Sequence, residues 1–201
     1  MTSQASIHVY PSKNYSSVTS EFLSTPRPYS TTAISRRDEW LQKGMRKTLH
    51  LLLLAHDNGV PCVLVQRAAS GYSCLEGVLE PGQSEEEAIK TILVRHLMKH
   101  SVSDRLEFSI SDCVLQLWRP DFDDHLYPYL PGHVSRPKEQ LRLVLVGLPP
   151  RAVLQLPPGV ALDAVPLGEL KRRGQAGFGS LLAAVPDVLS RTSLKMLVTQ
   201  Q

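Results

Sequence analysis

The part of this chain that best indicates its fold is a glycine-containing loop followed by a charged run over 85–99. The loop reads Leu75-Glu76-Gly77-Val78-Leu79-Glu80-Pro81-Gly82-Gln83-Ser84. Ser84 is a good helix N-cap, and Glu87 three residues later completes a capping box. Apolar residues then recur at helical spacing, at Ala88, Ile89, Ile92, Leu93 and Leu97. The sequence therefore predicts a loop that leads into an amphipathic helix over 85–99.

This loop and helix resemble the Nudix box, G-x5-E-x7-R-E-U-x-E-E-x-G-U. In that box the helix glutamates hold Mg²⁺, which draws charge from a diphosphate and activates a water. Here the acidic loop position is Gln83, and the segment corresponding to R-E-U-x-E-E reads Thr91-Ile92-Leu93-Val94-Arg95-His96. Because arginine and histidine repel a divalent cation, the sequence predicts a Nudix frame that is not an enzyme. We expect no catalytic residues, no bound metal and no cofactor.

Length and composition indicate a single globular domain and limit the classes of protein to which the chain can belong. At 201 residues and 42% hydrophobic content, the chain fits one domain with a sizeable core. Cys62, Cys74 and Cys113 lie in apolar surroundings without C-x-x-C spacing, which favours reduced thiols and an intracellular compartment. No apolar run approaches the ~18 residues of a membrane span, and the N-terminus lacks a signal-peptide layout. Neither membrane insertion nor secretion is indicated.

The positive charge is concentrated near the N-terminus. The net charge is +3, and residues 1–47 carry seven basic groups against three acidic ones. A basic N-terminal face suits a polyanion partner such as RNA, whereas an ordinary solvated segment explains the same charge equally well.

The remaining pattern predicts an α+β sandwich. Residues 1–32, rich in Ser, Thr and Pro, are expected to form an extended N-terminal arm, and 33–201 the main domain with a C-terminal helix. A short helix over 33–45 is expected to turn Ile34, Trp40 and Leu41 inward. Strands are predicted at 48–56 and 60–66, joined by the turn at 57–59, and again at 109–118 and 141–148, with a closing helix over 180–191.

A second segment points to a particular family. It reads Arg119-Pro120-Asp121-Phe122 and then Tyr127-Pro128-Tyr129-Leu130-Pro131-Gly132-His133-Val134-Ser135-Arg136-Pro137-Lys138-Glu139. This run resembles the small, Nudix-fold subunit of pre-mRNA cleavage factor I, the family of cleavage and polyadenylation specificity factor subunit 5. Supporting similarity extends over roughly 7–191, for example at Tyr10-Pro11 and Gly44-Met45-Arg46. The resemblance implies a degenerate Nudix domain, an α/β/α sandwich with N- and C-terminal extensions.

The resemblance also implies a function. Members of that family are nuclear homodimers that bind RNA rather than hydrolyse nucleotides, and a UGUA element of the pre-mRNA is read in the old substrate cleft. A larger subunit with an RNA-recognition domain docks beside it. Three hypotheses follow: a non-catalytic RNA-binding subunit, a protein-binding scaffold of the same complex without sequence-specific RNA reading, and a surviving Nudix hydrolase.

Individual site residues follow from the same resemblance. Tyr72 takes the position of an aromatic ring that stacks under a base, and the alternative is a half-covered loop tyrosine. His50 stands where the family has a glutamate that accepts from base N–H groups, which makes UGUA specificity doubtful. Arg27, Arg46 and Arg67 are candidate phosphate contacts.

Two other groups of residues have weaker signals. The proline-rich loop with Tyr127, Tyr129 and Pro131 suits docking of the larger subunit, or else simply covers the sheet edge. His96 and His100 have a metal-binding spacing, but no further ligand is apparent, so two surface histidines are the better interpretation.

Overall fold

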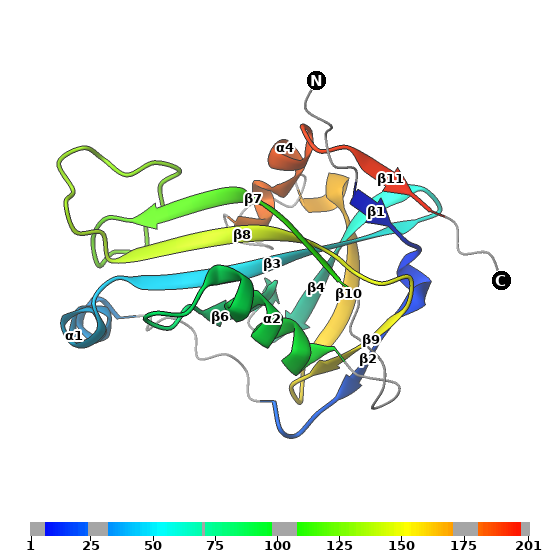
Figure 1. Cartoon of the computed structure of the whole chain (residues 1–201), viewed down its shortest axis with the longest axis horizontal. Coiled ribbons are helices and arrows are strands. Elements are labelled where there is room, and N and C mark those ends of the chain that lie inside the picture. Colours follow the sequence, from blue (N-terminus) through cyan, green and yellow to red (C-terminus); the bar gives the residue numbers. More distant parts are fainter. Residues whose placement is uncertain (1–6, 24–31, 70, 98–107, 171–180, 198–201) are drawn as a thin grey trace.

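A computed structural model of the chain describes residues 7–23, 32–69, 71–97, 108–170 and 181–197 (Figure 1). The helices are α1 (Ala33–Lys43), α2 (Glu85–His96) and α4 (Val185–Leu189), with a 3-10 turn η1 (Ser12–Asn14). The strands are β1 (Ile7–Val9), β2 (Tyr15–Thr19), β3 (Arg46–Asp57), β4 (Val60–Ala68), β5 (Gly71–Ser73), β6 (Leu75–Val78), β7 (Ser109–Arg119), β8 (Glu139–Gly147), β9 (Ala152–Leu156), β10 (Ala161–Pro166) and β11 (Leu194–Met196).

A mixed sheet in the order β10-β4-β3-β8-β7 forms the centre of the molecule. β3 and β8 are parallel, and the other neighbours in this order are antiparallel. The short strand β5 pairs with β4, and β6 pairs with the first half of β3. The four strands predicted from the sequence are confirmed. So is the turn between β3 and β4, where Asn58 and Gly59 both have positive φ.

β3 is buried on both of its faces, so it divides the core in two. Leu49, Leu51 and Leu53 face a first cluster that includes α2, whereas Leu52 and Leu54 face a second cluster. All five side chains are at most 4% exposed. A strand whose two faces are both apolar requires a covering layer on each side of its sheet.

α2 covers the first face. Ser84 and Glu87 form the predicted capping box, and Ala88, Ile89, Ile92 and Leu93 are buried against the sheet. The helix approaches β6 closely at Gly77, where an added Cβ would lie 2.7 Å from the side chain of Ile92. The first glycine of the box is therefore needed so that the helix can pack against the strand.

The second face is covered by the C-terminal segment (Figure 1). Leu182, Val185 and Leu189 are at most 4% exposed and belong to the second cluster, so these side chains pack on the core. In the described part of that helix, residues 181–183 are helical and α4 follows. A mixed sheet with helical cover on both faces is the α/β/α sandwich that the sequence predicted.

The N-terminal segment differs from the expected free arm. Its described residues are extended, but β1 pairs with β11 and β2 pairs with β9, both in the C-terminal half of the chain. Val9 is fully buried and Tyr15 is 7% exposed. The Tyr15 hydroxyl also donates to the Pro149 carbonyl at 3.0 Å. Local composition missed this packing because both partners lie more than a hundred residues away.

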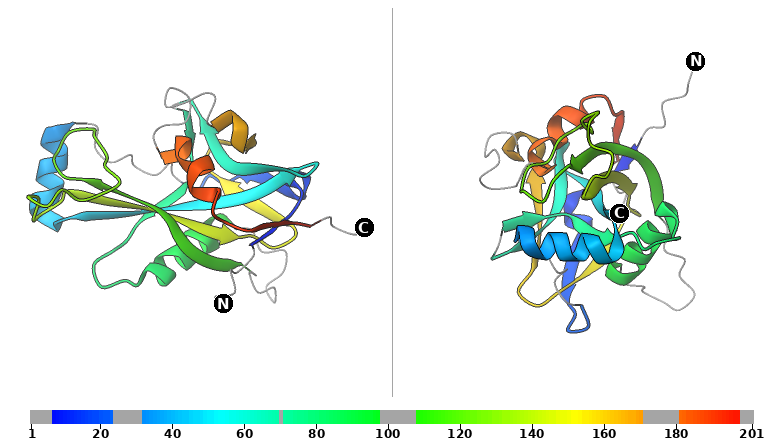
Figure 2. Two further views of the ribbon diagram at one scale, coloured as in Figure 1. Left: turned by 90° about the horizontal axis from the view of Figure 1, so that it is seen from above. Right: turned by 90° about the vertical axis from the view of Figure 1, so that its left-hand side faces the viewer.

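The predicted helix near residue 33 forms, and Trp40 packs against Phe122 as expected, but the expected orientation of Ile34 and Leu41 was wrong. Ile34 is 75% exposed and Leu41 is 64% exposed, and the buried residue of α1 is Arg36. Figure 2 shows α1 at one end of the long sheet, beside the loop that joins β7 to β8. That loop presents two backbone carbonyls and the Asp124 carboxylate to Arg36, and its Phe122 ring meets Trp40 edge to face at 6.0 Å.

No described helix is both long enough and apolar enough to cross a membrane.

Truncating the helix side that packs on β3 should destabilise the fold. Leu93→Ala is expected to lower the free energy of unfolding by about 2–5 kcal/mol, because Leu93 is fully buried. Val94→Ala on the same helix is the matched control, since Val94 is 54% exposed, and it should change stability by less than about 0.5 kcal/mol. Urea denaturation followed by circular dichroism measures both, and equal losses would contradict the packing described here.

Candidate functional site: the cleft between β6 and α2

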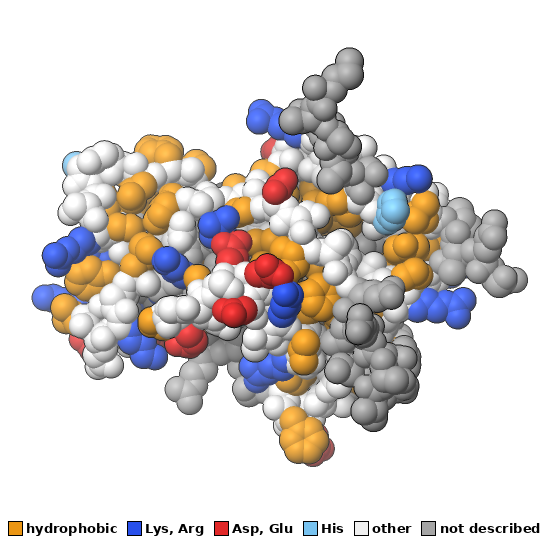
Figure 3. All heavy atoms as spheres, in the orientation of Figure 1, with side chains coloured by type: hydrophobic (Ala, Val, Ile, Leu, Met, Phe, Trp, Pro, Cys, Tyr) orange, Lys and Arg blue, Asp and Glu red, His pale blue; other side chains and the backbone are white. Residues whose placement is uncertain are grey.

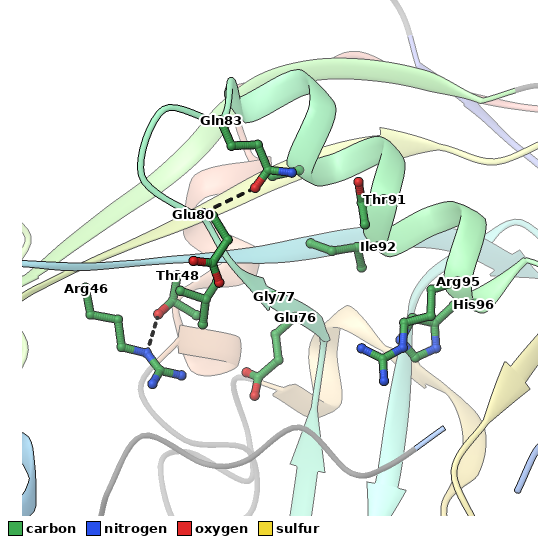
Figure 4. A pocket seen from close by; sticks show the side chains of 12 residues that line it. Arg46, Thr48, Glu76, Gly77, Glu80, Gln83, Thr91, Ile92, Arg95 and His96 are labelled. Atoms are coloured by element: carbon green, nitrogen blue, oxygen red, sulfur yellow. Dashed lines mark hydrogen bonds between the residues drawn. The ribbon is translucent and has the colours of Figure 1, made fainter. Parts of the chain in front are cut away.

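A cavity of about 470 Å³ opens where β6, the following loop and α2 meet the beginning of β3 (Figure 4). Its lining residues are Arg46, Thr48, Glu76, Gly77, Val78, Glu80, Gln83, Ala88, Thr91, Ile92, Arg95 and His96. The cavity is thus built from the box segment and from the polar start of β3. This is where the sequence placed the degenerate catalytic site.

The α2 wall of the cavity presents no carboxylate. Its contributions are Ala88, Thr91, Ile92, Arg95 and His96. The three glutamates of the first helical turn have other partners: Glu85 lies 3.1 Å from Arg142, Glu86 pairs with Lys90, and Glu87 caps the helix at Ser84. All three lie in the first turn of the helix, where negative charge complements the helix dipole.

His96 is buried rather than on the surface. It is 5% exposed, and its Nδ1 lies 2.9 Å from the Gln155 carbonyl on β9. Burial lowers the pKa of His96. The expectation of a surface histidine was wrong, because the helix turns this position toward β9. His100, the other member of the predicted pair, lies outside the described residues.

The residues around the cavity do not fit a magnesium site. Mg²⁺ prefers near-octahedral oxygen ligands, and here the lining carboxylates are Glu76 and Glu80, with the Arg46 and Arg95 guanidinium groups nearby. Gln83 uses its side-chain oxygen to accept from the Glu80 backbone N–H at 3.2 Å, which closes the loop. Among the described residues, no three His, Cys, Asp or Glu side chains converge on one point.

His50 and Glu76 form a polar pair across two strands. They are direct partners in the β3–β6 register, and His50 Nδ1 lies 3.3 Å from a Glu76 carboxylate oxygen. Burial, and secondarily the charge of Arg46, lowers the pKa of His50 to about 4. Burial raises the pKa of Glu76, an effect that Arg46 opposes and Glu139 reinforces. His50 is therefore neutral near pH 7 and can donate its Nδ1–H to the carboxylate.

Beside this pair lies a buried cluster of charges at the start of β3 and β8. Glu139 is 2% exposed; one carboxylate oxygen accepts from Arg119 Nε at 3.0 Å, and the other accepts from the Thr48 hydroxyl at 3.0 Å. Arg46 Nε lies 3.7 Å from the same carboxylate, and its Nη1 lies 3.6 Å from Glu39. Arg46 was predicted to contact phosphate, but two acidic side chains hold its guanidinium.

The other candidate phosphate contacts are also engaged or undescribed. Arg67 Nε donates to an Asp163 carboxylate oxygen at 2.7 Å, with the arginine side chain 54% exposed. Arg36, also basic, is buried and bonds the carbonyls of Phe122 and Asp123 and the carboxylate of Asp124. Arg27 lies outside the described residues. Figure 3 shows basic and acidic side chains close together on one face rather than a continuous basic surface there.

Tyr72 lies on β5, opposite Arg67 on β4, and is partly buried. It packs against the second core cluster together with Cys74, so both point to the sheet face away from α2. His50 points the same way, since it alternates with Leu52 and Leu54 of that cluster along β3. The fold therefore brings the two sequence-predicted RNA contacts to the same side of the sheet.

The loop between β7 and β8 holds its aromatic residues in fixed positions. Tyr127 exchanges two backbone hydrogen bonds with Trp118, at 2.7 and 2.8 Å, and its ring meets Tyr129 edge to face at 6.1 Å. Tyr129 is 61% exposed, whereas Pro131 is partly buried. Behind them, Lys138 lies 4.0 Å from the centre of the Trp40 ring.

Sequence reasoning missed Glu76 and the Arg119–Glu139 pair. Glu76 lies within β6, Arg119 ends β7 and Glu139 begins β8, so each charged residue belongs to a strand of the sheet. Their partners, however, belong to other strands, and only the register of the sheet brings them together.

The chain matches known proteins over nearly its whole length. The NUDIX_2 family model, described as nucleotide hydrolase, matches residues 5–192. Pre-mRNA cleavage factor Im 25 kDa subunit 2 of Arabidopsis thaliana is 30% identical over 197 residues, which cover 95% of this chain and 96% of that protein. Cleavage and polyadenylation specificity factor subunit 5 of Dictyostelium discoideum is 30% identical over 164 residues, 80% of this chain and 81% of that protein.

Among solved structures, Ap4A hydrolase of C. elegans is similar in fold. The two sequences are 15% identical and the TM-score is 0.42. The match covers 72% of this chain and 94% of the hydrolase chain.

Acid should weaken the fold through His50. Its pKa is about 4 in the folded chain and near its ordinary value of about 6.5 when unfolded, so the unfolded state binds more protons between these values. The contribution of His50 to the free energy of unfolding is fully present above pH ~6.5 and is lost as the pH falls toward 4. Between pH 7 and 5 the loss from this group is about 2 kcal/mol. His50→Gln should remove that part of the pH dependence in urea denaturation at the two pH values.

Glu76 titrates in the opposite sense, because its raised pKa favours the folded state as the pH falls. It remains in the variant, so the difference between the two proteins isolates His50. If wild type and His50→Gln lost the same free energy of unfolding between pH 7 and 5, the buried neutral histidine described here would be wrong.

Proposed function

The chain belongs to the NUDIX_2 family and, within it, to the family of the pre-mRNA cleavage factor Im 25 kDa subunit, and we propose that it serves mRNA 3′-end processing without hydrolysing nucleotides. It binds pre-mRNA at the edge of the cleft beside β6, where Glu76 lines the cavity and His50 and Tyr72 lie on the sheet face away from α2. The observation that carries this proposal is the α2 wall of that cleft, where Arg95 and His96 stand in place of metal-binding carboxylates.

A surviving Nudix hydrolase is the weaker alternative. Such an enzyme needs a divalent cation to withdraw charge from the diphosphate and to activate water. In this cleft, Glu76 and Glu80 are the carboxylates available from the described residues, and Glu76 is engaged by His50. Two carboxylates beside two arginines give a poor oxygen cage for Mg²⁺.

Contact with RNA rests chiefly on Tyr72. Its ring lies on an outer strand, on the sheet face that carries His50 and Glu76, and it is only partly covered by the core. An aromatic ring in this position can stack under one base of a single strand irrespective of its identity. His50 and Glu76 then supply polar groups for a base edge.

The basic residues support a protein-binding scaffold as a second candidate. Arg46 and Arg67 are both held by carboxylates, and Arg36 is buried. A phosphate would have to compete with these partners, so the electrostatic share of RNA binding is expected to be small. If base contacts were also weak, the chain would act mainly through protein partners.

The proposed partners follow from the family and from one loop. The larger cleavage-factor subunit, which carries an RNA-recognition domain, docks on the loop that contains Tyr127, Tyr129 and Pro131. Tyr129 is exposed and packs edge to face on Tyr127, whose backbone is hydrogen-bonded to Trp118. A tyrosine held in this way loses little conformational entropy on binding, which suits an interface anchor. The functional unit is a homodimer in the nucleus.

RNA binding should depend on Tyr72 and not on Tyr129. Fluorescence anisotropy with UGUA-containing and scrambled RNA, at two salt concentrations, measures the dissociation constant. Tyr72→Ala is expected to weaken UGUA binding by about 1–3 kcal/mol, on the order of 5- to 150-fold. Tyr72→Phe keeps the ring and should bind as wild type does.

Tyr129→Ala is the matched control, because it removes an exposed aromatic ring from the loop between β7 and β8. It should leave RNA binding unchanged and weaken capture of the larger subunit. Equal and strongly salt-sensitive binding of both RNAs, or no binding, would favour the scaffold and refute base reading in this cleft.

A further inference from the structure

A groove lies beside the C-terminal end of α1, between that helix and the residues that lead into β8. It has a volume of about 570 Å³, and its lining includes Trp40, Leu41, Gly44, Met45, Arg136 and Pro137. A second cavity of about 490 Å³ adjoins it, since Trp40, Gly44 and Met45 line both. We propose that this α1 groove, together with the exposed side of α1, docks an acidic amphipathic helix of a protein partner.

α1 exposes apolar side chains next to the groove. Ile34 and Leu41 are both exposed, and they stand at positions i and i+7 of the helix, so they lie on one side of it about ~10 Å apart. Leu41 also lines the groove, which makes the helix side and the groove one surface. Exposed apolar residues that stand singly are normal, whereas a contiguous group beside a groove marks an interaction site. Amphipathic helices place their anchoring side chains at the same i and i+7 spacing.

The wall of the groove is held in place before any partner binds. Trp40 Nε1 donates to the Pro137 carbonyl at 3.3 Å, and its ring meets the Phe122 ring edge to face at 6.0 Å. Lys138 Nζ lies 4.0 Å from the centre of the Trp40 ring. The buried Arg36 donates to the carbonyl of Phe122 at 2.9 Å, which ties α1 to the loop that forms the other side of the groove. A surface fixed in this way loses little conformational entropy when a partner docks.

The charges around the groove favour an anionic partner. Four exposed cations stand on α1, at the start of β3 and in the loop: Arg37, Lys43, Lys47 and Arg136. Among the described residues, none of these four forms an ion pair. Asp38, Glu39 and Glu80 oppose this charge, but Glu39 already lies 3.6 Å from Arg46. Basic side chains lie among apolar ones at the left-hand end of Figure 3, where Figure 1 places α1, so a partner needs both acidic and apolar groups.

The same surface suits a protein segment better than RNA. Bases of a single strand stack on aromatic rings. Trp40 is the aromatic residue in the lining of the groove, and its ring already contacts Phe122 and Lys138. The other apolar side chains, Ile34, Leu41 and Met45, are aliphatic and pack best against apolar side chains of another protein. A helix with an apolar side bordered by Asp and Glu matches both the groove and its cations.

This surface is separate from the sites discussed above. The groove shares no lining residue with the cleft between β6 and α2, and its lining does not include Tyr127, Tyr129 or Pro131. The inference therefore goes beyond the proposed function and does not depend on RNA binding. It adds a docking site for a second protein segment beside the loop that presents Tyr129.

The test uses a fluorescein-labelled synthetic helix of about 18 residues, with leucines at i, i+4 and i+7 and with glutamates and alanines elsewhere. One control peptide has lysines in place of the glutamates, and another has the leucines in scrambled order. Fluorescence anisotropy with the full chain should show binding of the glutamate peptide about tenfold tighter than of either control, the sum of a few exposed charge pairs or the loss of an anchor. Raised salt should weaken it.

Variants of the protein locate the peptide. Leu41→Asp should weaken binding of the glutamate peptide about tenfold, because it removes an apolar anchor and adds a like charge. Lys43→Glu should weaken it in the same direction. Val94→Asp on α2 and Lys13→Glu at the other end of the molecule are the matched controls and should bind as wild type does. All four positions are exposed, so each variant is expected to fold.

The contrary outcomes are distinct. Equal affinity for the three peptides, no measurable binding, or binding that Leu41→Asp retains would overturn the inference. Binding that Tyr129→Ala abolishes and Leu41→Asp does not would place the peptide on the loop between β7 and β8 and overturn it as well. Displacement of the peptide by a uridine tract would assign the surface to RNA instead. RNA binding through Tyr72 is measured separately, so each proposal can fail while the other stands.

Discussion

The constraint on which the structure depends is the burial of β3 on both faces. Its apolar run from Leu51 to Ala55 is covered by α2 on one side and by the C-terminal segment on the other. The apolar run begins only after Arg46, Thr48 and His50, and the cleft opens at this polar beginning of the strand. One strand thus sets the position of the layers and of the site, since its apolar part requires cover and its polar part does not.

Two groups of buried polar residues at this end of the sheet have different roles. Glu139 is satisfied by Arg119 and Thr48, and it ties together β3, β7 and β8. Removing one partner of such a pair leaves a buried charge uncompensated, so the cluster is structural. In the His50–Glu76 pair, Glu76 lines the cavity, and the buried Nε2 of His50 has no hydrogen-bond partner among the described residues.

Much of the fold could be predicted because the patterns are local. The capping box at Ser84, the helix behind it and the turn at Asn58-Gly59 each depend on neighbouring residues, and each was predicted correctly. The pairing of β1 with β11 and of β2 with β9 depends on distant strands, so residues 7–19 were taken for a free arm. Ile34 and Leu41 of α1 are exposed and Arg36 is buried, because the partners of Arg36 are polar groups of a distant loop that the helix sequence does not reveal. Glu76 was overlooked for the same reason, since its importance comes from His50 across the sheet.

We propose that the former catalytic cleft of this Nudix fold binds RNA and performs no hydrolysis. The most direct test is an assay for Mg²⁺-dependent hydrolysis of a dinucleoside polyphosphate, made on a preparation shown to bind RNA. The account predicts turnover no faster than in buffer, with or without Mg²⁺. Turnover that requires Mg²⁺ and is abolished by Glu80→Gln would contradict it, and the cleft would then be that of a hydrolase.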